Sequence, residues 1–406
     1  MDRRTVRDLR DGELRGRRAL VREDLNVPLE DGRVGDDTRI RAALPTLEGL
    51  LDRGARVVVL SHLGRPRGKP EAKYSLRPVA TRLQELLPGR TVRFVADTVG
   101  DVARAAVAAL GDGELLVLEN TRFLPGEEMN DPELSRALAE LGDLYVNDAF
   151  GAAHRAHAST AGVAEYLRPA VAGLLMEREL QYLSGALERP ERPFVAVLGG
   201  AKISGTIDVV ESLLPRVDRM IVGGAMACTF FRALGLETGK SLVEPDRVEM
   251  AAELLAKAGD KLVLPVDAVV APSLDDAGGA AAHAVPREEI PTDEAMFDIG
   301  PASMEQFAAL VRGARTVLWN GPMGVFETPP FDAGTLAVAR ALADATSRGA
   351  TTIVGGGDSA AAIAQAGLED RVSHVSTGGG ASLEFLEGRT LPGVAALDRA
   401  GGGREG

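Results

Sequence analysis

Short apolar runs without polar–apolar alternation recur along the whole chain, and stretches with helical spacing separate them. The runs lie at 18–21, 55–60, 114–118, 143–146, 194–198, 219–222, 261–264, 316–319, 351–354 and 373–376. Between them lie stretches rich in Ala, Leu, Glu and Arg, such as 40–53 and 335–348. Non-alternating runs separated by helices indicate parallel strands that are buried on both faces. The predicted fold class is α/β, with two doubly wound parallel-sheet (Rossmann-like) domains.

The chain of 406 residues is too long for one compact core, so we expect more than one domain. Residues 176–188 have the pattern of a solvent-exposed helix, and the proline-containing segment 189–193 breaks the chain before the next run. We place the main boundary near 170–193. Residues 272–292 are rich in Ala, Gly and Asp and are expected to form a surface excursion.

Charge and cysteine content restrict the classes of partner. The formal net charge of −13 argues against sequence-independent binding to nucleic acid or to an anionic membrane. Cys228 is the only cysteine, which excludes an intramolecular disulfide and fits a reducing cytosol. The first residues lack the apolar core of a signal peptide, and no apolar run approaches the ~18 residues of a membrane span. We expect a soluble cytoplasmic protein.

In the first half of the chain, charged, imidazole and amide side chains follow the predicted strands. They are Asp24, Asn26, His62, Arg65, Arg122, His154, Arg155 and His157, with Arg39 at the start of the next helix. Ligands of open parallel sheets bind beyond the carboxyl ends of the strands, and guanidinium groups match carboxylate and phosphate oxygens. Each arginine alone is better explained as a surface residue, but their repeated placement predicts a small, highly anionic substrate. The H-x-x-H pattern at 154–157 lacks a third ligand, so we expect no zinc.

In the second half, glycine-rich loops follow the predicted strands. They lie at 198–202, 222–226, 319–327, 354–359 and 376–382 and contribute to a total of 47 glycines. Such loops let backbone N–H groups approach phosphates closely, although one loop alone could simply be a tight turn. Five in succession predict a polyphosphate ligand such as a nucleotide. Lys202 adds a mobile positive charge, Glu327 suits ribose hydroxyls, and Asp358 suits Mg²⁺ or, alternatively, a helix N-cap.

Two further segments resemble nucleotide-binding motifs but do not match them in spacing. The segment 235–241 resembles a Walker A motif, but three residues rather than four separate its glycines. The segment 355–360 fits G-x-G-x-x-A, yet the acidic residues Glu369 and Asp370 come too early for a nicotinamide-binding fingerprint. A nicotinamide dehydrogenase therefore stays a remote alternative.

The ordered set of motifs resembles the phosphoglycerate kinase family over roughly residues 15–395. The set is DLNVP, SHLGRP, ENTRF, VNDAFG with HRAHAST, LGGAK, GKSLVE, LPVD, FDIGP, WNGPMGVFE, VGGGDS and STGGGASLE. The resemblance implies reversible, Mg²⁺-dependent phosphoryl transfer between 1,3-bisphosphoglycerate and ADP on one side and 3-phosphoglycerate and ATP on the other, as in glycolysis. It also implies a monomer with hinge-bending domains.

The resemblance further implies a division of the chain. The expected parts are a triose-phosphate-binding domain at 1–172, a hinge helix at 173–190, a nucleotide-binding domain at 191–388 and a tail at 389–406. The tail would return toward the first domain, with its last residues disordered.

Site residues follow from the matching motifs. The triose phosphate would be held by Asp24, Asn26, Arg39, His62, Arg65, Arg122 and Arg155. The nucleotide would contact Gly200, Lys202, Thr206, Gly223, Gly224, Asn320, Pro322, Gly324, Val325, Glu327, Gly356, Gly357, Asp358 and Ser359. Asp358 would engage Mg²⁺. The catalytic group around the transferred phosphoryl would be Arg39, Lys202, Gly379 and Gly380.

The chain departs from the family pattern after LGGAK. Members usually continue V-S-D-K-I, whereas this chain has Gly205 in place of the aspartate and Thr206 in place of the lysine. Smaller departures are Ala225, Cys228 and Ser359. Loss of one charge-stabilising donor commonly costs about 10²–10³ in rate. Two hypotheses follow: an active kinase slowed by Thr206, or a paralogue that binds nucleotide and phosphoglycerate without useful turnover.

Overall fold

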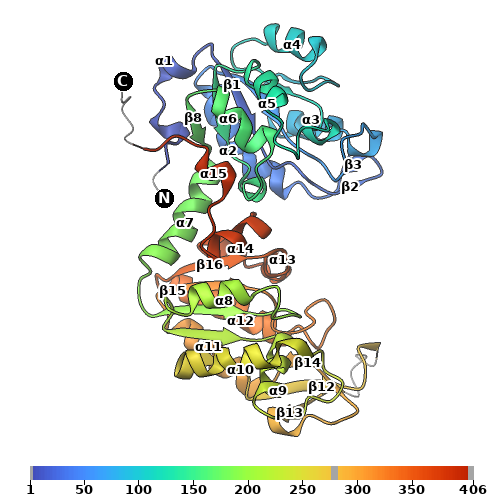
Figure 1. Ribbon diagram of the computed structural model, residues 1–406, viewed down its shortest axis with the longest axis vertical. Coiled ribbons are helices and arrows are strands. Elements are labelled where there is room, and N and C mark those ends of the chain that lie inside the picture. The colour runs from blue at the N-terminus through green and yellow to red at the C-terminus, as the bar shows by residue number, and fades with distance from the viewer. Residues whose placement is uncertain (1–2, 276–281, 401–406) are drawn as a thin grey trace. The chain divides into compact units, whose positions relative to one another are not determined.

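The computed structural model describes residues 3–275 and 282–400, and these form two compact units (Figure 1). Unit 1 comprises Met1–Gln181 and Thr390–Gly406, and unit 2 comprises Tyr182–Arg389. The expected disorder of the last residues concerns 401–406, which lie outside the described residues. No helix among the described residues has both the length and the apolar character that a membrane span requires.

Unit 1 is built on a six-stranded parallel sheet of order β5-β6-β4-β1-β7-β8. Its strands are β1 (Arg18–Arg22), β4 (Arg56–Leu60), β5 (Val92–Phe94), β6 (Leu115–Val117), β7 (Leu144–Asn147) and β8 (Ala170–Ala172). The chain adds strands on one side of β1 and then crosses to the other side at β7, so the topological switch point lies between β1 and β7. The sequence runs predicted the four central strands, but not the two three-residue strands at the edges.

The helices of unit 1 cover this sheet with apolar stripes. They are α1 (Asp11–Leu14), α2 (Thr38–Asp52), α3 (Arg77–Leu86), α4 (Asp101–Ala108), α5 (Pro132–Ala139), α6 (Val163–Tyr166), the first half of α7 (Leu174–Glu188) and α15 (Pro392–Ala395). In α2, Ile40, Leu47 and Leu51 recur near the helical period and are buried against the sheet. A short hairpin, β2 (Leu29–Glu30) with β3 (Arg33–Val34), precedes α2.

Helix α7 and the C-terminal tail both bury apolar side chains. Helix α7 is not solvent-exposed along its length, because Met176 and Leu180 are buried. Charged residues at neighbouring positions gave it the appearance of a surface helix. The described part of the C-terminal tail packs within unit 1, where Leu391, Val394 and Leu397 are buried.

Unit 2 is also built on a six-stranded parallel sheet, of order β11-β10-β9-β15-β16-β17, in which the chain crosses to the other side of the first strand after three strands rather than four. Its strands are β9 (Phe194–Leu198), β10 (Arg219–Val222), β11 (Leu262–Val263), β15 (Thr316–Asn320), β16 (Thr351–Gly355) and β17 (His374–Val375). The helices are α8 (Ile207–Leu213), α9 (Met226–Ala233), α10 (Val248–Ala258), α11 (Pro301–Arg312), α12 (Ala333–Ser347), α13 (Gly357–Gln365) and α14 (Gly380–Leu386). The switch point here lies between β9 and β15.

A second, antiparallel sheet of order β13-β12-β14 belongs to unit 2 and was not predicted. It consists of β12 (Asp267–Ala271), β13 (His283–Pro286) and β14 (Ala295–Ile299). The segment expected to be a surface excursion therefore contains a strand. Residues 283–286 are half-exposed or exposed, so the pattern lacked the apolar signal of a buried strand.

Candidate functional site

The segments that follow β6, β4, β1 and β7 in unit 1 lie side by side, because these strands are neighbours in the parallel sheet. Arg39, in the first turn of α2, is half-buried, and its Nη1 lies 2.6 Å from Oδ2 of Asp24. Asn26 Oδ1 accepts a hydrogen bond from Gly64 N at 2.8 Å, and Arg122 Nη1 donates to Gly64 O at 2.9 Å. The structure thus connects the loops after β1, β4 and β6, which had been predicted to carry one site.

Arg22 is a functional candidate that sequence reasoning missed. The guanidinium is fully buried at the end of β1, with Nη2 3.1 Å from Nδ1 of His62. Its Nε donates to Ser159 Oγ at 2.8 Å, and Ser159 Oγ in turn donates to the buried Glu127 at 2.5 Å. An arginine as the last residue of a strand buried on both faces was the available signal.

The two buried histidines of this cluster are uncharged near neutrality. Burial, with the charges of Arg22, Arg122 and Arg39 added, holds the pKa of His62 well below its ordinary value. Burial and the same kind of positive surroundings lower the pKa of His157 to about 4. The positive charge of the site therefore comes from arginine, and the imidazoles serve as neutral donors or acceptors.

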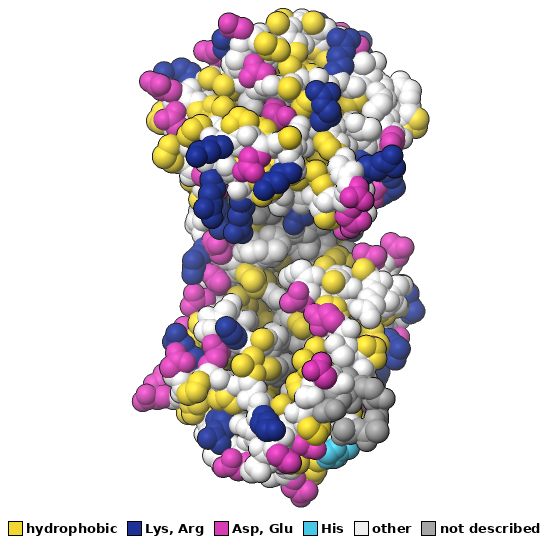
Figure 2. Space-filling model, turned by 90° about the vertical axis from the view of Figure 1, so that its right-hand side faces the viewer, with side chains coloured by type: hydrophobic (Ala, Val, Ile, Leu, Met, Phe, Trp, Pro, Cys, Tyr) yellow, Lys and Arg dark blue, Asp and Glu magenta, His cyan; other side chains and the backbone are white. Residues whose placement is uncertain are grey.

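The remaining predicted substrate residues lie at the exposed rim. Arg155 is exposed, with its Nε 3.3 Å from Nε2 of His154, and its charge contributes to the lowered pKa of Arg122, which burial dominates. Arg65 is exposed on the loop after β4. Figure 2 shows Lys and Arg side chains gathered on the displayed face of unit 1.

In unit 2, three glycine loops pack directly on one another at the switch point. Gly200 N donates to Pro322 O at 2.9 Å, and Gly224 N donates to Met323 O at 3.0 Å. A Cβ on Gly224 would lie 2.6 Å from both N and O of Gly200, and Gly223 and Gly324 are similarly enclosed by protein atoms. At these positions neighbouring protein atoms, rather than a ligand, exclude a side chain.

Other predicted glycines face open space. A Cβ on Gly200, Gly357 or Gly379 would meet nothing within 4 Å, and of these three only Gly200 and Gly379 have a positive φ. Gly379 and Gly380 begin α14, and Gly357 begins α13 beside the positive-φ Gly356. The glycines of these loops thus fall into two groups, those enclosed by neighbouring loops and those with open space at the Cβ position, and only the second group suits a phosphate.

Polar groups of the β15 and β16 loops complete this edge of the sheet. Ser359 Oγ accepts a hydrogen bond from Gly321 N at 2.6 Å, so the loops after β15 and β16 are joined. Asn320 Nδ2 is buried without a hydrogen-bond partner among the described residues, which leaves a donor for a ligand. Pro322 and Val325 are half-buried on the same loop, and Glu327 is exposed at its end.

Lys202 and Thr206 lie on the segment between β9 and α8. Lys202 is exposed, and Thr206 occupies the N-cap position of α8 without a side-chain capping bond. Between them, the Ser204 hydroxyl donates to Glu244 at 2.5 Å. Burial raises the pKa of Glu244, but the bonds from Ser204 and the charge of Lys202 outweigh it and the pKa is lowered.

One carboxylate at this edge of the unit 2 sheet could bind a magnesium ion. Asp358 is exposed in the first turn of α13, next to the open space at Gly357. Among the described residues no group of three or more His, Cys, Asp or Glu side chains could hold a metal by itself. This donor set fits Mg²⁺, which usually keeps several waters and is bound by one or two carboxylates together with phosphate oxygens.

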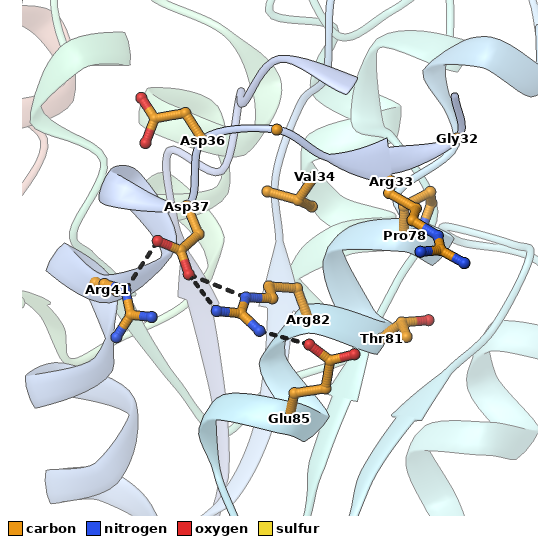
Figure 3. Close-up of a pocket in the computed structure, with 11 residues that line it drawn as sticks. Gly32, Arg33, Val34, Asp36, Asp37, Arg41, Pro78, Thr81, Arg82 and Glu85 are labelled. Atoms are coloured by element: carbon orange, nitrogen blue, oxygen red, sulfur yellow. Dashed lines mark hydrogen bonds and ion pairs between the residues drawn. The ribbon is translucent and has the colours of Figure 1, made fainter. Parts of the chain in front are cut away.

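A cavity of about 940 Å³ in unit 1 lies between the β2–β3 hairpin, α2 and α3 (Figure 3). Asp37 stands at its centre and accepts hydrogen bonds from Arg41 at 2.8 Å and Arg82 at 2.7 Å. Arg82 also donates to Glu85 at 2.5 Å. Because Asp37 precedes α2 directly, this ion-pair network holds the helix turn that carries Arg39. A cavity of about 530 Å³ in unit 2 lies at the opposite, amino-terminal edge of its sheet.

Comparison with known proteins gives one consistent result. Residues 9–389 match the family model described as phosphoglycerate kinase. A phosphoglycerate kinase of Chloroflexus aurantiacus is 59% identical over 405 residues, which cover 98% of this chain and 100% of the relative. The structure of phosphoglycerate kinase from Coxiella burnetii has a TM-score of 0.88 at 44% identity and covers 97% of this chain and 98% of its own. The structure of phosphoglycerate kinase from Pyrococcus horikoshii has a TM-score of 0.82 at 33% identity and covers 97% of this chain and 98% of its own.

Proposed function

The chain belongs to the phosphoglycerate kinase family and is a phosphotransferase, and we propose that the strand ends of unit 1 bind the triose phosphate while those of unit 2 bind the nucleotide. The reaction moves a phosphoryl group between the acyl phosphate of 1,3-bisphosphoglycerate and ADP, with 3-phosphoglycerate and ATP on the other side. The alternative of a paralogue without useful turnover is not favoured. The observation that best supports binding of the two substrates by different units is the contrast between the arginine cluster of unit 1 and the glycine loops of unit 2.

Recognition of the triose phosphate requires positive charge with fixed geometry. We assign it to Asp24, Asn26, Arg39, His62, Arg65, Arg122 and Arg155. The ion pair with Asp24 orients Arg39, and the bond to Gly64 O orients Arg122. Guanidinium forks held in this way can meet carboxylate and phosphate oxygens without further ordering of the side chains.

For the nucleotide we propose two kinds of contact. The β15 loop, with Asn320, Pro322, Gly324, Val325 and Glu327, and the glycines 200, 223 and 224 would line the nucleoside. Residues 356–359 and Lys202 would meet the phosphates, because the amides at the start of α13 and a mobile ammonium favour anions. Mg²⁺, held by Asp358 and the phosphates, would neutralise phosphate charge when it is bound.

Phosphoryl transfer needs positioning and charge neutralisation more than covalent chemistry. The attacking oxygen forms a bond to phosphorus as the bond to the leaving oxygen breaks. We propose that Arg39, Lys202 and the amides of Gly379 and Gly380 stabilise the negative charge of the transferred group. Thr206, in the nucleotide site, offers a hydroxyl where a lysine would add a full charge, so we expect a slower reaction.

We also propose that the enzyme works as a monomer in the cytoplasm. Cys228 is the only cysteine and is buried, and burial raises the pKa of its thiol to about 11, which supports the cytoplasmic location. Such a thiol is unreactive and fits a reducing compartment, where no disulfide is needed.

A coupled assay for ATP-dependent phosphorylation of 3-phosphoglycerate with Mg²⁺ tests the proposal. Arg39→Ala and Lys202→Ala are each expected to abolish turnover and to leave the circular dichroism spectrum unchanged. Arg104→Ala on α4 and Lys257→Ala on α10 are the matched controls, since both side chains are exposed and paired with surface carboxylates. An unaltered kcat in either test variant would remove that residue from the catalytic group, and no turnover in the unmodified protein would contradict the assignment.

A further inference from the structure

A buried network of hydrogen bonds, the Glu127 network, crosses the strand ends of unit 1 and ends at a proposed substrate residue. It begins at Glu127, on the loop after β6, and passes through Ser159, on the segment after β7, to Arg22 at the end of β1. From Arg22 it reaches His62, on the loop after β4. The first three side chains are fully buried, and that of His62 is nearly so. The network thus joins the segments that follow four neighbouring strands.

Glu127 fixes the direction of the hydrogen bonds made by Ser159. Its Oε1 accepts from Ser159 Oγ at 2.5 Å, and its Oε2 accepts from Ser159 N at 3.0 Å. A carboxylate can only accept, so the single proton of the Ser159 hydroxyl points to Glu127. A lone pair of Ser159 Oγ is then left for Arg22, whose Nε donates to it at 2.8 Å. Both oxygens of the buried carboxylate therefore hold one residue, and that residue holds the guanidinium group.

Arg22 in turn determines which nitrogen of His62 carries a proton. A guanidinium group has only N–H donors, so the contact of 3.1 Å between Arg22 Nη2 and His62 Nδ1 requires a lone pair on Nδ1. Arg22 Nη1 donates to the carbonyl of Glu23, which fixes the orientation of the guanidinium further. Burial and the positive charges of nearby arginines, Arg22 first, hold the pKa of His62 well below its ordinary value, so the ring has a single proton near neutrality. That proton is on Nε2.

The second ring nitrogen of His62 is left for a ligand. Within the part of the chain that the structure describes, His62 Nε2 makes no hydrogen bond and is not among the enclosed polar atoms that lack a partner. The charges of Arg39 and Arg122 act on the same ring, so this N–H lies close to two residues that we assign to the triose phosphate. A single N–H in a fixed direction can donate to a carboxylate or phosphate oxygen.

We infer that Glu127 is a positioning residue: through the Glu127 network it keeps the proton of His62 on Nε2, from which that proton is donated to an anionic oxygen of bound phosphoglycerate. The proposal rests on the function proposed above. A neutral imidazole has two tautomers, and the other one would present a lone pair on Nε2, which repels an anionic oxygen. Glu127 is fully buried, so it acts on the substrate only through its neighbours.

The position of the proton is read by ¹⁵N NMR of the full chain labelled at histidine, without substrate and without turnover. The chain has five histidines, and His62→Gln identifies the resonances of this one. A ring nitrogen that carries a proton differs widely in ¹⁵N shift from one that does not. At about neutral pH we expect a single neutral form, with Nδ1 unprotonated and Nε2 protonated. A proton on Nδ1, a mixture of tautomers or a charged ring would overturn the proposal.

Two variants interrupt the Glu127 network before it reaches Arg22. Glu127→Gln replaces an acceptor by a donor, because Ser159 N retains the remaining amide oxygen and the new NH₂ group faces the hydroxyl. Ser159→Ala removes the hydroxyl and leaves the charges of Glu127 and Arg22 in place. In each variant we expect a mixture of tautomers at His62. The KM for 3-phosphoglycerate should rise by about three- to tenfold with a smaller change in kcat, because the weakened hydrogen bond serves binding.

Glu133→Gln is the matched control, because this carboxylate is exposed in the first turn of α5, and it should change neither the tautomer nor KM. If Glu127→Gln fails to fold, Ser159→Ala carries the same test. An unchanged His62 tautomer in either folded variant, even with a raised KM, would contradict the positioning role. A protein with the expected tautomer that binds no 3-phosphoglycerate in a calorimetric titration would contradict the proposed function and leave the control of the tautomer supported.

Discussion

His62 and His157 show how the environment of a residue sets its protonation state. The sequence placed histidines together with arginines at the predicted anion site. In the structure both are buried among arginines, which lowers their pKa values, so they are neutral at physiological pH. The anion site therefore depends on Arg39, Arg122 and their neighbours, and protonation of these histidines adds nothing to substrate affinity near neutrality.

Thr206→Lys tests the most important departure from the family at the residue scale. An added ammonium near the phosphates should raise kcat by about a hundredfold to a thousandfold. The native hydroxyl makes no capping bond, so no cap is lost in this variant. The new cation at the N-terminus of α8 should lower the free energy of unfolding by about 0.3–1 kcal/mol. Measurements of kcat and of thermal unfolding check both expectations. Thr206→Met, similar in length but uncharged, should leave kcat low; an equal rise in that variant would contradict the charge argument.

At the scale of the elements, the strand-end loops combine two uses of glycine. Gly224 packs against the Gly200 backbone with φ of +66°, whereas Gly357 has open space at its Cβ position and an ordinary φ. Substitutions at the two positions can therefore distinguish the packing of the loops from the approach of a ligand at the same edge of the sheet.

Gly357→Ala is expected to raise the KM for ATP by roughly tenfold, because a methyl group would occupy the space assigned to a phosphate. Its unfolding midpoint should stay unchanged. Gly224→Ala, the matched variant, should instead destabilise the fold by about 2 kcal/mol or more, since backbone atoms would have to move. Kinetics and thermal unfolding of both variants provide the measurement, and an unchanged KM in Gly357→Ala would argue against a phosphate at this loop.

The start of α2 depends on the ion-pair network around Asp37. Arg82→Ala removes its link to α3, so the turn that carries Arg39 should be less well positioned. We expect the KM for 3-phosphoglycerate to rise by about two- to fivefold with little change in kcat. Glu85→Gln removes only the outer pair with Arg82 and serves as the control. Equal effects of the two substitutions would show that Asp37 does not position the helix.

At the scale of the whole molecule, the chain returns to unit 1 after completing unit 2. Asp398 N donates to Ala170 O at 2.8 Å, and Gly393 N donates to Ala153 O at 2.8 Å. With Leu391, Val394 and Leu397 buried, the tail contributes to the core of unit 1 although it is the last part of the sequence.

Removal of residues 390–406 should therefore destabilise unit 1 by about 5 kcal/mol, from the loss of three buried aliphatic side chains. Trp319 is the only tryptophan and is fully buried in unit 2, so its fluorescence reports the unfolding of that unit. Denaturant unfolding followed by circular dichroism should show a weakened transition in the truncated chain, while the Trp319 transition keeps its midpoint. A shift of the Trp319 transition alone would contradict this assignment.

The sequence by itself determined the strand pattern and the types of side chain at the strand ends. Non-alternating runs and helical spacing are local signals, so the central strands could be predicted, and with them Asp24, Arg39, Arg122 and the glycine loops. The edge strands β5 and β8 were missed because Arg93 interrupts the first and alanines flank the only larger apolar residue of the second. The tertiary structure alone decided that β1 adjoins β7 and that Arg22 reaches Ser159, 137 positions later. Burial, protonation and packing of glycine against glycine depend on such distant contacts, which no local pattern records.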